Sequence, residues 1–191
     1  MDVAPTDGDS RRPPSVADPE AFVLAALAQR PPPALILCGG IGEGKTSAAT
    51  HLVEALRAQG VAAGGILAPR VVDGGTTVAY QVLDVASGKR QLLLDSRPPG
   101  VAVGRFYLRS EGVRFARGAI DRAVASRRLV VIDEVGRLEL GGGGHAAALR
   151  AARAAGAPLV LTVRTPFVAR VVERFALAPC GAHRVAGGGR E

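Results

Sequence analysis

The sequence predicts an α/β fold, in which a mostly parallel sheet carries helices on both faces and the chain includes an antiparallel hairpin insertion. Two observations lead to this prediction. Short apolar runs of strand length alternate with segments of helical spacing, and these runs are continuously apolar, as in strands covered on both faces. One segment instead alternates apolar and polar residues with a period of two, which is typical of a half-buried antiparallel strand.

Four apolar runs and the helical segments between them are expected to form the parallel layer. Asp18 and Ser110 are the expected N-caps of two helices, because their short side chains accept hydrogen bonds from the first backbone N–H groups. Three prolines at 31–33 end the first helix, and Gly60 is the expected C-cap of the second. The expected strands are residues 34–38, 61–67, 129–132 and 158–163, and the expected helices are residues 19–30, 46–59, 111–126, 145–155 and 166–175.

The antiparallel hairpin is expected between residues 76 and 94. Residues 76–85 alternate in polarity between two turn sequences, and residues 90–94 are the partner strand. We expect a loop over residues 95–104 and a flexible break at the four glycines 141–144.

One folded domain is expected over residues 19–178, because 191 residues correspond to about one domain. Residues 1–18 are rich in Asp, Ser, Pro and Gly and predict a disordered leader. Residues 179–191 show little pattern and are expected to form a tail.

Composition excludes several classes of protein. No apolar run is long enough to cross a membrane, and the polar start does not resemble a secretion signal, so by elimination we expect a cytoplasmic protein without membrane association. Cys38 and Cys180 are too few for a disulfide scaffold or a zinc site. The net charge of +7 comes from scattered arginines, and the chain has two Tyr, five Phe and no Trp for base stacking. We therefore expect no nucleic-acid binding, and the sequence identifies no protein partner.

A phosphate-binding loop follows the first expected strand. Its glycines let backbone N–H groups turn inward around an anion, and the next helix directs its positive end to the same place. Lys45, one of only two lysines, stands where the pattern requires lysine to reach the β- and γ-phosphates, and Thr46 is the expected Mg²⁺ ligand. The pattern G-x-x-x-x-G-K-[ST] is matched by Gly39, Gly40, Ile41, Gly42, Glu43, Gly44, Lys45 and Thr46, and we expect these residues and the following Ser47 to bind the nucleotide.

Acidic residues end the apolar run 129–132. Asp133 is the second expected Mg²⁺ ligand, acting mainly through water, and Glu134 is the expected catalytic residue that polarises the attacking water. Both are also expected in the nucleotide site. Arg137 is a candidate for transition-state stabilisation, with a surface ion pair to Glu139 as the alternative. Thr162 and Arg164, at the end of another apolar run, are candidates for contact with the γ-phosphate.

Several of these segments together resemble one known family. The phosphate-binding loop, the Gly64-Gly65 strand, residues 103–106 and above all the run Asp133-Glu134-Val135-Gly136-Arg137-Leu138-Glu139-Leu140 are similar to the nucleoside-triphosphatase family of thermophilic bacteria, archaea and animals. In animals the family is called cancer-related nucleoside-triphosphatase. The resemblance covers about residues 34–175.

This resemblance implies a RecA-like P-loop fold and slow Mg²⁺-dependent hydrolysis of several nucleoside triphosphates to the diphosphate and phosphate, with weak base selectivity. Lys45 and Glu134 would then act in catalysis. The sequence departs from the family in three places: Ala68-Pro69-Arg70 replaces a Thr-Arg-Glu run, Arg164 replaces a histidine, and the glycines at 141–144 replace a more structured segment.

One function is excluded by the residues and two others stay possible. The chain contains no asparagine, so it lacks the Asn-Lys-x-Asp guanine motif, and a small GTPase is excluded. A nucleotide-dependent switch or accessory module would use the same loop with incidental hydrolysis. A small-molecule kinase would use it with an acceptor held near Arg105, Arg109, Arg114 and Arg117.

Overall fold

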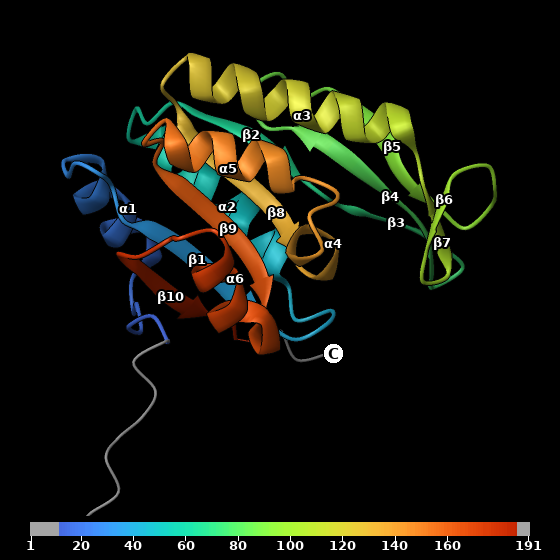
Figure 1. The fold of residues 1–191 in the computed structure, drawn as a ribbon, viewed down its shortest axis with the longest axis horizontal. Helices are drawn as coiled ribbons and strands as arrows, with labels where there is room; N and C mark the ends of the chain where they lie inside the picture. The colour runs from blue at the N-terminus through green and yellow to red at the C-terminus, as the bar shows by residue number, and fades with distance from the viewer. Residues whose placement is uncertain (1–11, 187–191) are drawn as a thin grey trace, which may run out of the picture.

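A single sheet organises residues 12–186, which are the residues that the computed structural model describes (Figure 1). Its parallel part has the order β10-β1-β9-β8-β2, so β9 lies between the strand that precedes the phosphate-binding loop and the strand that carries Asp133. The predicted fold class is confirmed. The parallel strands are β1 (Ala34–Gly39), β2 (Ala63–Leu67), β8 (Leu129–Val135), β9 (Leu159–Arg164) and β10 (Cys180–Arg184).

An antiparallel extension continues the sheet beyond β2, and Figure 1 shows it projecting away from the parallel layer. It is larger than the predicted hairpin, because β3 pairs with β4 and a second short hairpin begins within the segment 95–104, which was expected as a loop, and ends beyond it. These extra strands have three or four residues, too few for an alternation of polarity to be recognised in the sequence. The extension consists of β3 (Arg70–Asp73), β4 (Thr76–Asp84), β5 (Arg90–Asp95), β6 (Val101–Val103) and β7 (Phe106–Leu108).

Helices cover both faces of the parallel layer, and neighbouring residues of β1 show this directly. Leu35 and Leu37 belong to the apolar cluster under α1 (Pro19–Leu27) and α2 (Lys45–Ala58). Ile36 and Cys38 belong to a second cluster on the opposite face, because successive side chains of a strand point to opposite sides. That cluster packs against α3 (Ser110–Ala125), α5 (Ala146–Ala154) and α6 (Val168–Arg174), and α4 (Arg137–Leu140) and the 3₁₀-helix η1 (Thr165–Phe167) complete the chain.

The helix caps only partly follow the prediction. Asp18 caps α1 as expected, since its carboxylate accepts hydrogen bonds from the backbone N–H groups of Glu20 and Ala21, both at 3.0 Å. The prediction for Ser110 was wrong: Ser110 is the first residue of α3, and Arg109 is the cap. The reason is that the Arg109 N–H donates to the Leu93 carbonyl of β5 at 2.8 Å, which holds the chain extended up to that residue.

The first and last parts of the described residues lie side by side at the edge of the sheet. Residues 180–184, which we expected within a tail, form β10, and its register along β1 runs from Ala34 with Cys180 to Cys38 with Arg184. Residues 14–16, expected within the leader, run beside β10: Val16 N–H donates to the Ala182 carbonyl at 2.7 Å, and Ala182 N–H donates to the Pro14 carbonyl at 2.8 Å. The rest of the expected leader and tail, residues 1–11 and 187–191, lies outside the described residues. Between residues 12 and 186, no helix has the length and apolar character needed to cross a membrane.

The packing of α3 on the antiparallel extension leads to a first prediction. A Cβ on Gly112 would overlap the Leu92 carbonyl oxygen and come within 2.7 Å of the Leu93 Cα, so Gly112→Ala is expected to destabilise the fold by about 1–3 kcal/mol. Gly118 of the same helix is the matched control, because a Cβ there meets only the Arg122 guanidinium at 3.1 Å. Gly118→Ala is expected to stabilise the fold by roughly 0.5–1 kcal/mol. Urea unfolding of both variants measures the difference, and equal stabilities would contradict this packing.

Candidate active site

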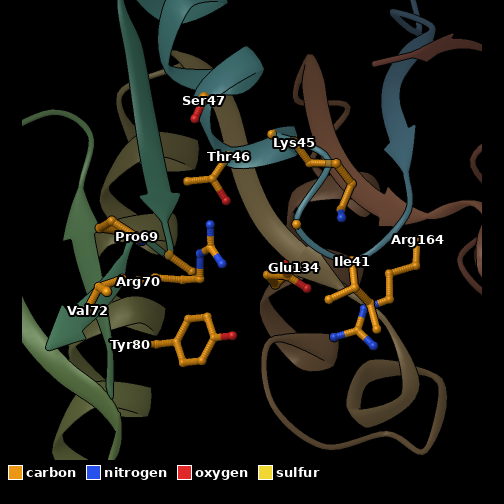
Figure 2. A pocket seen from close by; sticks show the side chains of 13 residues that line it. Ile41, Lys45, Thr46, Ser47, Pro69, Arg70, Val72, Tyr80, Glu134 and Arg164 are labelled. Carbon is orange, nitrogen blue, oxygen red and sulfur yellow. The ribbon is translucent and has the colours of Figure 1, made fainter. Parts of the chain in front are cut away.

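A cleft of about 270 Å³ opens at the carboxyl ends of the parallel strands, where ligands bind in open α/β sheets. One wall is the phosphate-binding loop, the floor includes the tip of β8, and the far wall comes from the β2–β3 bend and β4 (Figure 2). The lining residues are Ile41, Gly42, Gly44, Lys45, Thr46, Ser47, Ala68, Pro69, Arg70, Val72, Tyr80, Glu134 and Arg164.

The loop exposes backbone donors at the start of α2. Gly42 and Gly44 have φ angles of +76° and +82°, a left-handed conformation that glycine adopts without steric cost. Gly44 is the N-cap of α2, and no side chain caps this end of the helix. The first N–H groups of a 14-residue helix therefore face the cleft, together with the positive end of its dipole.

Gly40 is held from two sides within the loop. The Lys45 ammonium donates to the Gly40 carbonyl at 2.6 Å, and the Gly40 N–H donates to the Glu43 carboxylate at 2.6 Å. Lys45 is only 4% exposed, and Figure 2 shows its amine directed toward the interior of the cleft. Gly39, Gly40 and Glu43 shape the loop from behind the cleft lining, whereas the other predicted loop residues and Ser47 lie at the cleft itself.

Asp133 is buried beneath the cleft, with no exposed surface. Its carboxylate accepts hydrogen bonds from the Ala68 N–H at 2.9 Å, from the Glu134 N–H at 3.0 Å and from the Thr162 hydroxyl. Thr162 in turn accepts from the Glu134 N–H at 2.8 Å. Asp133 therefore joins the tip of β8 to the β2–β3 bend and to β9, and it does not line the cleft.

The Glu134 side chain points into the cleft, unlike the buried side chain of Asp133 beside it (Figure 2). Its φ of +61° is a conformation that costs a residue with a side chain on the order of 1–3 kcal/mol, and the pairing of β8 with β9 is irregular between Ile132 and Val135. Burial, together with the negative charge of Asp133, raises the pKa of the Glu134 carboxyl, against the opposing effect of Lys45 and Arg164. The carboxylate has no hydrogen bond within residues 12–186, so it is available to a ligand.

Arg137 lies outside the cleft. Its guanidinium is over the Phe167 ring, 5.6 Å from the centroid. The alternative ion pair with Glu139 does not occur within the described residues, because the Glu139 carboxylate is buried and accepts from Gly136 N–H at 2.9 Å and His145 N–H at 3.2 Å. The structure brings Lys45, Thr46 and Glu134 together but not Arg137.

Comparison with known proteins agrees with this geometry. The sequence model of the NTPase family matches residues 34–182. The chain belongs to the NTPase family. A family relative, the nucleoside-triphosphatase THEP1 of Methanopyrus kandleri, is 32% identical over 129 residues, which cover 68% of this chain and 72% of the relative.

Two solved structures of the family share the fold. A human cancer-related nucleoside triphosphatase has a TM-score of 0.67 at 24% identity, over 83% of this chain and 91% of the human one. THEP1 from the hyperthermophile Aquifex aeolicus has a TM-score of 0.65 at 21% identity, over 80% and 90% of the two chains. The fold is thus the RecA-like P-loop class that the resemblance implied.

The sequence gives no signal for the far wall of the cleft in this NTPase family member. Pro69 and Arg70 stand out only as part of a departure from the family pattern, and no motif marks Val72 or Tyr80 as site residues. Their positions depend on how the antiparallel extension folds back on β2, and no short motif in the sequence encodes that. The four arginines that were candidates for holding a kinase acceptor do not line the cleft. Arg105 and Arg109 are hydrogen-bonded to the Thr77 carbonyl and to Asp95 of the antiparallel extension. Arg114 and Arg117 lie on α3, where each pairs with an acidic residue of the same helix.

Proposed function

We propose that this chain hydrolyses nucleoside triphosphates to nucleoside diphosphate and phosphate in the cleft between the phosphate-binding loop and the tip of β8. The observation that carries the proposal is the meeting of three features at one cleft: the uncapped amino end of α2, the Lys45 ammonium and the Glu134 carboxylate. Backbone N–H donors and an ammonium suit the phosphates, and a carboxylate opposite them that no group of residues 12–186 occupies suits a water molecule. Membership of the NTPase family supports the same reaction.

In the proposed reaction, the phosphate-binding loop with Lys45 and the Glu134 carboxylate have different roles. The loop amides and Lys45 bind the β- and γ-phosphates and stabilise negative charge as it shifts toward the leaving diphosphate. Glu134 orients a water molecule and takes its proton as the water oxygen bonds to the γ-phosphorus. The bond from the γ-phosphorus to the β–γ bridging oxygen then breaks, which releases diphosphate and phosphate.

The residues present fit a magnesium ion that arrives with the nucleotide. The Thr46 side chain lines the cleft, and hydroxyl, carboxylate and phosphate oxygens are the ligands that Mg²⁺ prefers. Thr46 would hold the ion directly and Asp133 would act through water, since the Asp133 carboxylate is buried and already hydrogen-bonded. When bound, the ion supplies positive charge that offsets the charge of the phosphate oxygens.

Base selectivity is expected to be weak. The charged and hydrogen-bonding groups of the cleft are suited to phosphates, and the apolar side chains on its rim, such as Ile41 at 79% exposure and Val72 at 55%, offer no pattern of donors and acceptors for one base. ATP, GTP, CTP and UTP should therefore have kcat/KM values within about tenfold of one another, or roughly 1.4 kcal/mol. Steady-state kinetics with the four nucleotides measure this, and a preference of about a thousandfold for one base would reveal a dedicated base pocket.

Phosphate release from purified full-length chain tests the proposed function against its two alternatives. Continuous release from ATP with Mg²⁺ and no acceptor is the expected result. Release of phosphoryl groups only to an added small-molecule acceptor would replace hydrolysis by kinase activity. Tight nucleotide binding with negligible turnover would instead support a nucleotide-dependent switch.

A further inference from the structure

The backbone around Arg70 is fixed at the far wall of the cleft. Ala68, two residues earlier, donates its N–H to the buried Asp133 carboxylate at 2.9 Å. The Pro69 carbonyl accepts from the Gln81 N–H at 3.1 Å, and Arg70 itself lies directly opposite Tyr80 in the β3–β4 ladder. Side chains opposite each other in such a ladder share one face, and both of these line the cleft.

The Arg70 side chain has no partner within residues 12–186. Figure 2 shows its guanidinium reaching into the cleft toward Thr46, while Lys45 and Arg164 extend from the opposite wall. Two nearby arginines are engaged within the protein: Arg105, between β6 and β7, donates to the Thr77 carbonyl at 3.1 Å, and Arg109, the N-cap of α3, pairs with Asp95 at 2.7 Å. Arg70 thus holds a positive charge in the cleft that no group of residues 12–186 pairs with.

The charges at the cleft call for a strongly anionic ligand. Among the lining residues that the structure describes, Lys45, Arg70 and Arg164 contribute three positive charges, and Glu134 is the only acidic side chain. Arg70 lies on the wall that faces the loop, so a phosphate chain bound along the loop would end between Arg70 and Glu134. That end is the γ-phosphate, where the proposed attack takes place.

We propose that Arg70 binds the γ-phosphate and stabilises the charge on it during hydrolysis, as a catalytic arginine supplied by the first residue of the chain's own β3. The inference rests on the proposed function and extends it. A guanidinium offers parallel N–H groups that match two phosphate oxygens, which a lysine ammonium cannot do. Since Asp133 holds Ala68, the same buried carboxylate positions both Glu134 and Arg70.

Two variants of Arg70 and one matched arginine variant test this inference. Arg70→Ala is expected to lower kcat by about 10²- to 10³-fold, the effect of removing one well-placed donor to a developing charge. The preference of the chain for a non-hydrolysable triphosphate over the diphosphate, measured by calorimetric titration with Mg²⁺, should fall by about tenfold or more. Arg70→Lys keeps the positive charge but lacks the paired N–H groups. Its kcat and its triphosphate preference should therefore lie between those of Arg70→Ala and those of the parent chain.

Arg117→Ala is the control, because Arg117 is exposed on α3 with only an Asp121 ion pair at 3.6 Å; it should leave kcat and both affinities unchanged. Arg70 is exposed, so its variants should unfold at the temperature of the parent chain. Unchanged kcat together with an unchanged triphosphate preference in Arg70→Ala would overturn the inference. If the parent chain hydrolyses no triphosphate, the proposed function is wrong. The binding measurement still decides the role of Arg70 in that case: loss of the triphosphate preference in Arg70→Ala supports a γ-phosphate contact, and retention of the preference rejects it.

Discussion

Lys45→Ala is expected to abolish nearly all phosphate release while the chain stays folded. The Lys45 ammonium is directed into the cleft, and its one hydrogen bond within the described residues is to the Gly40 carbonyl at 2.6 Å. On the proposed function, removing it takes away the positive charge that would face the β- and γ-phosphates, and a charge held in place where negative charge develops has a large effect on the rate. We expect kcat to fall by at least about 10²- to 10³-fold and triphosphate affinity to fall as well.

The other lysine of the chain is a natural control for this variant. Lys89 is exposed on the turn before β5, away from the cleft, so Lys89→Ala makes the same change of charge without touching the site. A phosphate-release assay and calorimetric titration on both variants give the comparison, with circular dichroism to check the fold. If Lys45→Ala hydrolysed ATP as fast as Lys89→Ala, the loop would not be the site.

Glu134→Gln is expected to separate binding from turnover. The substitution keeps size and shape but removes the carboxylate that would take the proton of the attacking water, so kcat should fall by about 10²-fold or more. Triphosphate affinity should be retained, because this group acts in the transition state rather than in the bound ground state. Glu54→Gln, at an exposed position of α2, is the matched control. Full turnover in Glu134→Gln would favour the kinase or the switch over hydrolysis.

The pH dependence of turnover gives an independent test of Glu134. Burial and the neighbouring Asp133 raise the pKa of its carboxyl above the ordinary glutamate value. A base must be ionised to accept a proton, so turnover should be full above this raised pKa and should decline as pH falls through it. The decline should begin at a higher pH than an unperturbed glutamate would give, and it should be absent from the residual activity of Glu134→Gln. A flat profile in the parent chain across the acidic range would argue against Glu134 as the base.

The features that the sequence determined by itself are those encoded in short contiguous segments of the chain. The phosphate-binding loop places its glycines, lysine and threonine through local backbone geometry, and the structure puts that loop between β1 and α2 as predicted. Continuously apolar runs predicted the central parallel strands, because burial on both faces leaves no polar alternation. The family follows from such segments as well, since the loop and the run from Asp133 to Leu140 lie within the matched residues 34–182.

Tertiary structure decided the rest, because it joins groups that are far apart in the chain. The Asp133 carboxylate is buried where it accepts hydrogen bonds from Ala68 of the β2–β3 bend and from Thr162 of β9, whereas the left-handed backbone at Glu134 turns the next carboxylate into the cleft. Two adjacent acids in a sequence carry no information about which is buried. Arg137 is drawn over Phe167 and away from the cleft, while Arg70 reaches it through the fold of the antiparallel extension. Side-chain direction depends on long-range hydrogen bonds and packing, and these exist only once the strands have paired.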